Sequence, residues 1–155
     1  MSTEPRAAMI RPAEQSDLAA VRSLDGRRMR PSTSQSVTEI LETTQRQLLV
    51  ADLDGAIVGF AVLGRFFEYD FLELLFVGPD YRRTGIATQL VGGAEAVAMT
   101  GKLFTSTNDS NEAMKELCEK LGFVRSGVLD GLDEDDPEVF YVKSLPRARA
   151  PLATV

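Results

Sequence analysis

The stretch from Phe71 to Ala87, FLELLFVGPDYRRTGIA, constrains the fold more than any other part of the chain. It begins at residues 71–77 as a strand with more apolar residues than simple alternation requires, which indicates a central strand buried on both faces. Gly78 and Pro79 then force a turn, and a helical pattern begins at Thr84, directly behind two arginines. A central strand that leads through a tight turn into a helix is typical of α/β proteins.

Strand and helix patterns alternate along the rest of the chain. Short apolar or alternating segments bounded by turn residues predict strands at residues 7–11, 48–52, 56–63, 71–77, 103–107, 123–129 and 138–144. Helical spacing of apolar residues predicts helices at residues 36–45, 84–99 and 111–121, and another that begins at a cap, Ser16 or Asp17. The order β-α-α-β-β-β-α-β-α-β-β predicts an α/β (α+β) fold with a mixed central sheet of six to seven strands and about four flanking helices.

Glycines mark two of the expected contacts between these elements. Asp54-Gly55 reads as the tight turn of a hairpin between the second and third strands. Gly92 and Gly93 stand in the middle of the 84–99 helix, where each costs roughly 1 kcal/mol relative to alanine. Close packing of this helix on the sheet is the simplest reason to keep them.

At 155 residues the chain has the length of one compact domain, which we expect to span residues 1–155 with a core at about 7–145 and a tail at 146–155. Residues 1–5 and the tail read as weakly structured termini. No segment has the apolar core of a signal peptide, or the roughly 20 apolar residues of a membrane span. The sequence therefore predicts a cytoplasmic protein without a membrane partner.

Composition excludes several classes of function. With 17 basic and 23 acidic residues the net charge is −6, which disfavours general binding to nucleic acid or to anionic membranes. Cys118 is the one cysteine, so an intrachain disulfide framework is excluded. The chain has no histidine, which excludes the familiar histidine-based zinc sites and Ser-His-Asp triads. We expect no metal.

The residues that open the 84–99 helix combine positive charge with small side chains. The first amides of a helix have no acceptor inside it, and the helix dipole adds about half a positive charge at this end. Gly85 and Ala87 leave room for a ligand to reach the main-chain N–H groups, and Arg82 and Arg83 supply counter-charge. The pattern therefore predicts a binding site for a diphosphate.

Neither common nucleotide-binding loop is present, because GxxxxGK[ST] and G-x-G-x-x-G are both absent. The pattern that is present, Arg82-x-x-Gly85-x-Ala87, resembles the Q/R-x-x-G-x-G/A signature of the GCN5-related N-acetyltransferase (GNAT) superfamily. Its surroundings match the superfamily in order and spacing, at Leu75-Phe76-Val77, Gly78-Pro79, Tyr81, Asn111 and Leu121-Gly122-Phe123. The agreement in element order extends from Met9 to Ser144.

This resemblance implies acetyl-coenzyme A as cosubstrate. In the superfamily the backbone of the strand before the signature binds the pantetheine arm like an added strand, and the matching residues are Leu75, Phe76 and Val77. The diphosphate then falls to Arg82 and to the N–H groups of Arg83, Thr84, Gly85, Ile86, Ala87 and Thr88. Asn111 matches a position that contacts the cofactor, and it is equally well explained as an ordinary helix N-cap.

The resemblance also implies direct transfer of the acetyl group to a primary amine of a small molecule or peptide, in a ternary complex. Glu73, on the central strand, is the candidate general base, and its alternative is a surface glutamate. Cys118 stands where the superfamily frequently has a tyrosine that protonates or positions the departing thiolate. It is either a proton donor or a small buried residue that packs as an apolar one does. Ser106 replaces the base of the branch that acetylates protein N-termini, which disfavours that branch.

The sequence leaves the acceptor amine open. The acidic loop at residues 130–138 would attract a cationic amine, or it is a solvated hairpin tip. Arg28 and Arg30 would meet a carboxylate or the cofactor's phosphates, and Tyr69 and Tyr141 would line the site or simply pack. A non-catalytic acyl-coenzyme A-binding sensor and a scaffold without any cofactor are the competing functions. Members of the superfamily are often homodimers, and the resemblance extends that expectation to this chain.

Overall fold

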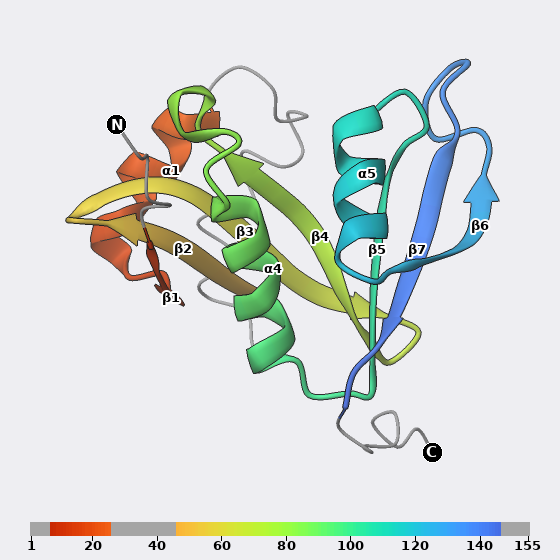
Figure 1. Ribbon diagram of the computed structural model, residues 1–155, viewed down its shortest axis with the longest axis horizontal. Coiled ribbons are helices and arrows are strands. Elements are labelled where there is room, and N and C mark those ends of the chain that lie inside the picture. Colours follow the sequence, from red (N-terminus) through yellow and green to blue (C-terminus); the bar gives the residue numbers. More distant parts are fainter. Residues whose placement is uncertain (1–6, 26–45, 147–155) are drawn as a thin grey trace. The chain divides into compact units, whose positions relative to one another are not determined.

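The computed structural model describes residues 7–25 and 46–146. Seven strands form a hydrogen-bonded sheet in the order β1-β2-β3-β4-β5-β7-β6 (Figure 1). They are β1 Met9–Pro12, β2 Gln47–Leu53, β3 Ala56–Phe66, β4 Tyr69–Val77, β5 Lys102–Asn108, β6 Val124–Leu129 and β7 Glu138–Ser144. The α-helices of the described part are α1 Leu18–Asp25, α4 Ile86–Val97 and α5 Glu112–Lys120. This mixed sheet with its helices confirms the predicted α/β fold.

The predicted elements within the described residues are all present, and their boundaries are close to the expected ones. The largest difference is at β3, which ends at Phe66 rather than at residue 63. The predicted helix at 36–45, the residues Arg28 and Arg30, the N-terminal residues 1–5 and all but the first residue of the 146–155 tail lie outside the described residues. The chain divides into two compact units, the first Met1–Gly64 with Leu74–Val97 and the second Arg65–Glu73 with Ala98–Val155.

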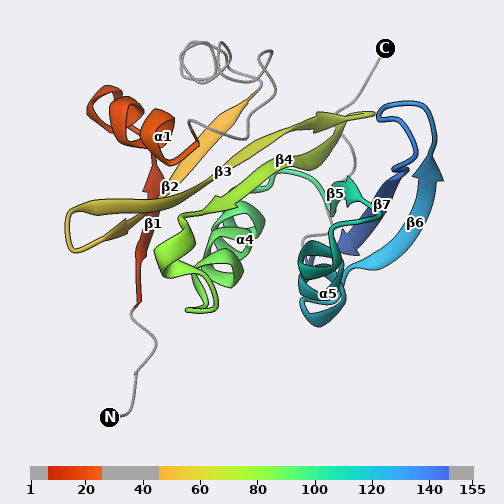
Figure 2. The same ribbon diagram turned by 90° about the horizontal axis from the view of Figure 1, so that it is seen from above.

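In the first unit, β1, β2 and β3 pair antiparallel. The turn between β2 and β3 is Asp54-Gly55, and both residues have positive φ (52° and 91°), as a tight hairpin turn requires. This confirms the predicted turn. Figure 2 shows α1 and α4 on opposite faces of these strands. The face under α1 holds a core of Leu18, Val21, Leu48, Val50, Phe60 and Val62.

The other face of the first unit is covered by α4. This helix buries Ile86, Leu90, Val91 and Ala94 against the sheet. A Cβ atom on Gly93 would collide with the side chain of Ile10 in β1, so this glycine allows the close packing that the sequence suggested. Gly92 differs, because a Cβ there would meet no atom within 4 Å. Close packing on the sheet therefore does not explain Gly92.

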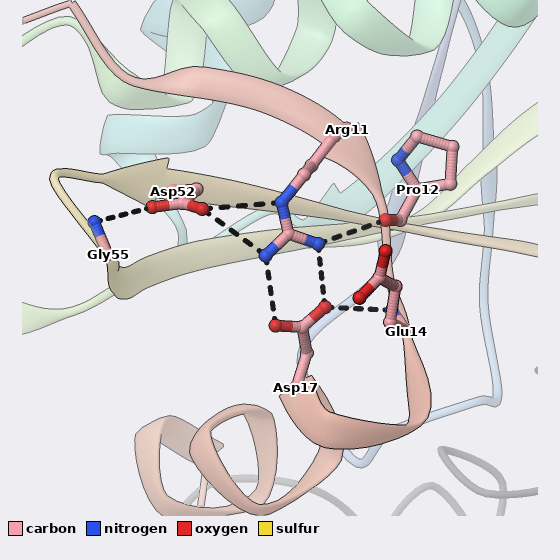
Figure 3. Close-up of polar contacts among 6 residues, drawn as sticks. All are labelled: Arg11, Pro12, Glu14, Asp17, Asp52 and Gly55. Atoms are coloured by element: carbon pink, nitrogen blue, oxygen red, sulfur yellow. Dashed lines mark hydrogen bonds and ion pairs between the residues drawn. The ribbon is translucent and has the colours of Figure 1, made fainter.

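A charged cluster holds the start of α1 against β1 and β2 (Figure 3). The N-cap of the short 3-10 turn before α1 is Glu14, so the expected cap at Ser16 or Asp17 is wrong. Asp17 is instead bound by Arg11 of β1, whose Nη1 and Nη2 donate to its carboxylate at 2.7 and 3.0 Å. These hydrogen bonds lower the pKa of Asp17. Arg11 also donates to Asp52 of β2, at 3.3 Å, so one guanidinium ties three elements together.

The second unit contains the first half of β4 together with β5, β7, β6 and α5. β4 pairs parallel with β5, from Asp70 opposite Leu103 to Leu72 opposite Thr105, whereas β5–β7 and β7–β6 are antiparallel. Figure 2 shows α5 against one face of β5, β7 and β6. The side chains buried in this unit include Leu103, Cys118, Phe123, Val139 and Tyr141.

A buried polar cluster fixes the start of β4. The Asp70 carboxylate accepts hydrogen bonds from the N–H groups of Met99 and Thr100, at 3.0 and 2.8 Å, and from the Thr100 hydroxyl. Arg65, at the end of β3, lies 3.9 Å from the same carboxylate and donates to the Met99 sulfur at 3.6 Å. The hydrogen bonds from residues 99 and 100 satisfy the buried Asp70 carboxylate, whereas Arg65 Nη1 is buried without a hydrogen bond among the described residues and meets Asp70 only as an ion pair.

Candidate functional site

The junction between β4 and α4 is built by a tight turn and a short 3-10 helix, Pro79–Tyr81. Gly78 N–H donates to Val58 O at 2.8 Å, which anchors the turn on β3. Arg83 and Gly85 both have positive φ (61° and 86°), so α4 begins at Ile86 and not at Thr84 as the sequence predicted. The helix cannot start earlier, because left-handed residues do not continue a right-handed helix.

The two arginines of the junction are exposed. Arg82 turns back toward the strand, where its Nε donates to Val77 O at 3.3 Å and its guanidinium carbon lies 6.0 Å from the centre of the Phe76 ring. This places a fixed positive charge at the carboxyl end of β4. Arg83, in the left-handed conformation, is the second cationic residue beside the start of the helix.

The first main-chain N–H groups at the start of α4 have no hydrogen-bond acceptor inside the helix. The first hydrogen bond into the helix runs from Gln89 N–H to Gly85 O, at 3.1 Å, so the N–H groups of residues 85–88 precede it. A Cβ atom built on Gly85 would meet nothing within 4 Å, so the space beside this backbone is open. Buried Ile86 fixes the helix start on the sheet. The diphosphate site that the sequence predicts here stays a prediction, and the open N–H groups are the feature on which it depends.

The strand that leads into the junction is less buried than expected. Leu75, Phe76 and Val77 are half-buried, and within residues 71–77 only Leu72 is buried. Buried Asp70 lies on the same face as Leu72, so the prediction of a strand buried on both faces is wrong. One face of this end packs on the α1 core, which Phe76 joins by stacking on Phe60 with ring centres 5.6 Å apart. Because side chains alternate between faces, one face of the strand remains incompletely covered within the described residues.

The predicted catalytic residues belong to the second unit. Glu73 is half-buried and stands two residues after Phe71, which β4 places opposite Phe104 of β5. Period-two alternation therefore puts Glu73 on the same face as these two phenylalanines. Cys118 lies on the inner side of α5 and is only 1% exposed. Burial raises the pKa of its thiol to about 11, so the sulfur is protonated at neutral pH.

Asn111 is the N-cap of α5, with its Oδ1 accepting a hydrogen bond from Met114 N–H at 3.2 Å. This geometry supports the capping alternative for Asn111 and leaves a cofactor contact as a proposal. The two tyrosines that could line the site pack against other residues instead. Tyr141 is buried, and the centre of the Tyr69 ring lies 5.8 Å from that of Phe104. The pKa of Tyr141 is raised mainly by burial and, to a lesser extent, by the charge of the neighbouring Cys118.

The acidic loop at 130–138 is anchored at two points. Asp133 accepts a hydrogen bond from the Asn108 side chain at 2.8 Å, and Asp136 accepts from the N–H and hydroxyl of Ser110 at 3.0 and 2.6 Å. These contacts hold the loop against the end of β5.

The described residues contain no group of three or more histidine, cysteine or acidic side chains placed to hold a metal ion. None of the helices in residues 7–25 and 46–146 is long and apolar enough to span a membrane.

Sequence reasoning missed an aromatic pocket of about 400 Å³ in the second unit. Phe66, Phe67, Phe104, Phe140 and the β6 segment 126–129 line it. The signal in the sequence was the pair Phe66-Phe67 directly before Glu68, in a place where a hairpin turn usually has Asn or Gly. The four phenylalanines come from three separate parts of the chain, so only the fold brings them together.

Comparison with known proteins places these features in a family. A model of the acetyltransferase (GNAT) family matches residues 17–123. A GNAT-family acetyltransferase of Bacillus cereus is 30% identical, with a TM-score of 0.80 over 90% of this chain and 98% of that one. No curated protein sequence matches significantly.

Two more distant structures share the fold. The ribosomal-protein-S18-alanine N-acetyltransferase of Escherichia coli is 20% identical, with a TM-score of 0.76 over 94% of this chain and 99% of that one. An aminoglycoside 6'-N-acetyltransferase complexed with coenzyme A is also 20% identical, with a TM-score of 0.76 over 90% and 98%. The family model covers more than half of the chain, and its match includes the β4–α4 junction. The chain belongs to the acetyltransferase (GNAT) family.

Proposed function

We propose that this protein transfers the acetyl group of acetyl-coenzyme A to a primary amine of a small molecule or peptide. The observation that carries the proposal is the β4–α4 junction, where the N–H groups of residues 85–88 precede the first bond of α4 and open space lies beside Gly85. Such a helix start is a ready-made anion site. The coenzyme A bound to the aminoglycoside acetyltransferase of the same fold supports the choice of ligand.

In this proposal the backbone does most of the binding. The N–H groups from Arg83 to Thr88 bind the diphosphate, and Arg82, held on Val77 O, adds charge without needing to reorganise. The backbone of Leu75, Phe76 and Val77 binds the pantetheine arm in the manner of an added strand. Any side chain at Gly85 would enter the space that the phosphates need, which is why a glycine suits this position.

The reaction proposed is direct attack of a neutral amine on the thioester carbonyl carbon. The C–N bond forms, the C–S bond breaks, and coenzyme A leaves as a thiolate. Glu73 is the proposed base that takes the proton of the attacking amine. Cys118 is the candidate that protonates the thiolate, by the resemblance to the superfamily. Burial raises its pKa to about 11, which makes it a weaker acid than an ordinary thiol and works against this role. Its alternative is a packing residue, in which case solvent supplies the proton.

Calorimetry with acetyl-coenzyme A and thiol release across a panel of primary amines test the proposal together. We expect micromolar binding, about −8 kcal/mol, and thiol release that requires an amine. No heat at millimolar acetyl-coenzyme A would leave a scaffold without a cofactor. Tight binding with no thiol release from any amine, unchanged in Glu73→Gln, would favour an acyl-coenzyme A sensor instead.

A further inference from the structure

The aromatic pocket of the second unit lies on the face of β5 and β7 that α5 does not cover. Phe104 and Phe140 belong to β5 and β7, and Phe66 packs against both, with ring centres 5.6 Å apart in each case. Phe71 of β4 joins the cluster at 5.3 Å from Phe66. Segment 126–129 of the edge strand β6 completes the lining. The pocket is an open groove, and its volume of about 400 Å³ lies within the roughly 300–1,000 Å³ of small-molecule sites.

The rim of the pocket is formed by Phe67, whose backbone conformation and exposure both disfavour the stability of the fold. Phe67 is 82% exposed and has a φ of +46°, and Glu68 after it has a φ of +71°. A two-residue turn with both φ positive favours Asn-Gly, since a bulky side chain is strained there. An exposed phenyl ring also loses the favourable burial of its apolar surface. Backbone strain combined with an exposed aromatic ring lowers stability, and strained residues cluster at functional sites, so this position is a reason to look for a ligand.

The turn holds the Phe67 ring in a defined place. It stands edge-on to Phe66, with ring centres 4.9 Å apart and planes at 89°, which is a favoured aromatic arrangement. The turn is flanked by Arg65 and Asp70, which form an ion pair at 3.9 Å, and Asp70 is held by the hydrogen bonds of residues 99 and 100. Phe67 is therefore a positioned wall of the pocket.

Carboxylates lie beside the aromatic floor on the same face of the sheet. Glu138 stands two residues before Phe140 in β7, and its Oε1 accepts a hydrogen bond from Ser106 at 2.8 Å. Glu73 stands two residues after Phe71, so alternation places it on this face as well. The residues that line the pocket include no lysine or arginine. The chemistry here is an aromatic slot next to negative charge.

We propose that this pocket is the acceptor subsite and that it selects an arylalkylamine, a primary ammonium on a short chain from an aromatic ring. The ring would enter between Phe67 and the Phe104–Phe140 floor, and the ammonium would meet the carboxylates of Glu138 and Glu73. Aromatic rings bind flat apolar groups edge-on or offset and also attract cations, so both ends of such an amine are recognised. This inference depends on the proposed acetyl transfer, whose acceptor it specifies.

The test compares phenethylamine with ethylamine as acceptors for wild type and Phe67→Ala. Phe67 is exposed, so its truncation leaves the folded state intact. We expect the ratio of kcat/KM for phenethylamine over ethylamine to be at least about tenfold in wild type and to fall at least about tenfold in Phe67→Ala. Val124→Ala is the matched control, because Val124 is an exposed apolar residue of β6 outside the pocket lining, and we expect it to keep the wild-type ratio.

Glu138→Gln separates the charge from the aromatic wall. It keeps a side chain that can still bond Ser106, and we expect it to raise the KM of both amines while leaving their ratio unchanged. Equal kcat/KM for the two amines in wild type, or a ratio that Phe67→Ala does not change, would overturn the inference. Either result leaves the proposed acetyl transfer standing, because thiol release is still observed.

A second readout does not depend on turnover. Saturation-transfer NMR with phenethylamine alone should show ring signals that weaken in Phe67→Ala and persist in Val124→Ala. If no amine gives thiol release, the proposed function fails. The pocket is then judged by this binding alone: ring signals that depend on Phe67 support an aromatic-amine site, and their absence from wild type overturns it.

Discussion

The start of α4 and the aromatic face of β5 and β7 offer a ligand different parts of the chain. At the α4 start the binding groups are main-chain amides, and the side chains are absent, as at Gly85, or turned back, as at Arg82. On the aromatic face the binding groups are side chains, from Phe67 to Glu138, and the backbone only spaces them. The first region should be sensitive to any added side chain, and the second to the loss of one.

Replacing the proposed base should give the largest effect and should affect catalysis alone. In Glu73→Gln we expect kcat to fall by roughly 100-fold or more, which is the contribution of a positioned general base. The affinity for acetyl-coenzyme A, measured by calorimetry, should stay the same, because the junction residues are untouched. Glu116→Gln, an exposed residue of α5, is the control. A wild-type kcat in Glu73→Gln would remove Glu73 from the mechanism.

Adding one carbon at the junction should have the next largest effect. Gly85→Ala places a Cβ in the proposed phosphate space, and loss of one or two charge-assisted hydrogen bonds should weaken acetyl-coenzyme A binding by roughly 10- to 100-fold. Gly55→Ala is a close match, since Gly55 also has a positive φ (91° against 86°) and an open Cβ position. Both variants should lose a similar free energy of unfolding, about 1–2 kcal/mol. Equal acetyl-coenzyme A affinities in the two variants would contradict the junction's role.

The Arg11–Asp17 pair should matter for stability and not for acetyl transfer. Removing the charge in Asp17→Asn should lower the free energy of unfolding at pH 7 by about 1–3 kcal/mol, as for other hydrogen bonds to charged groups. Because the folded-state pKa of Asp17 is lowered, its stabilisation is present above the ordinary value of 3.8 and is lost as the pH falls through the folded-state pKa. Urea unfolding of both proteins at pH 7 and near pH 3 should therefore show a difference that shrinks in acid. A constant difference would mean that the ion pair is not its source.

Truncation of Cys118 should distinguish packing from proton donation. If the side chain only packs, Cys118→Ala lowers the free energy of unfolding by about 1 kcal/mol and leaves kcat unchanged, and this is the outcome that its 1% exposure favours. The thiol should also react slowly with a disulfide reagent at pH 8, since burial raises its pKa to about 11. A kcat reduced in both Cys118→Ala and Cys118→Ser, with the fold intact by circular dichroism, would instead support a proton donor, because a serine hydroxyl is a much weaker acid than a thiol.

Asn111 should show the smallest effect. As the N-cap of α5, its loss in Asn111→Ala should cost about 1 kcal/mol of unfolding free energy, and Asn111→Asp should restore it, because aspartate caps equally well. If Asn111 contacts the cofactor, Asn111→Asp should not restore binding, since a carboxylate would repel the phosphates. Weaker acetyl-coenzyme A binding in Asn111→Asp, with stability intact, would therefore reveal a binding role beyond capping.

The difference between the two regions also explains what the sequence could predict. The junction lies within one short segment, so Arg82, Gly85 and the strand before them were visible as a pattern, and the fold followed from the order of strands and helices. The aromatic pocket combines Phe66 and Phe67 with Phe104 and Phe140, residues whose proximity depends on strand pairing that no local pattern shows. The cap of α1 was missed for a related reason: Arg11 binds Asp17 across a turn, and this contact replaces the expected one.

The central claim, that main-chain amides at the start of α4 hold a diphosphate, can be observed directly by nuclear magnetic resonance. Titration of ¹⁵N-labelled protein with coenzyme A should move the amide signals of residues 85–88 strongly downfield, and hydrogen-bond couplings from these nitrogens to phosphorus should appear, while the amide of Gly55 stays in place. Saturable binding of coenzyme A that leaves the amides of residues 85–88 unshifted would contradict the account.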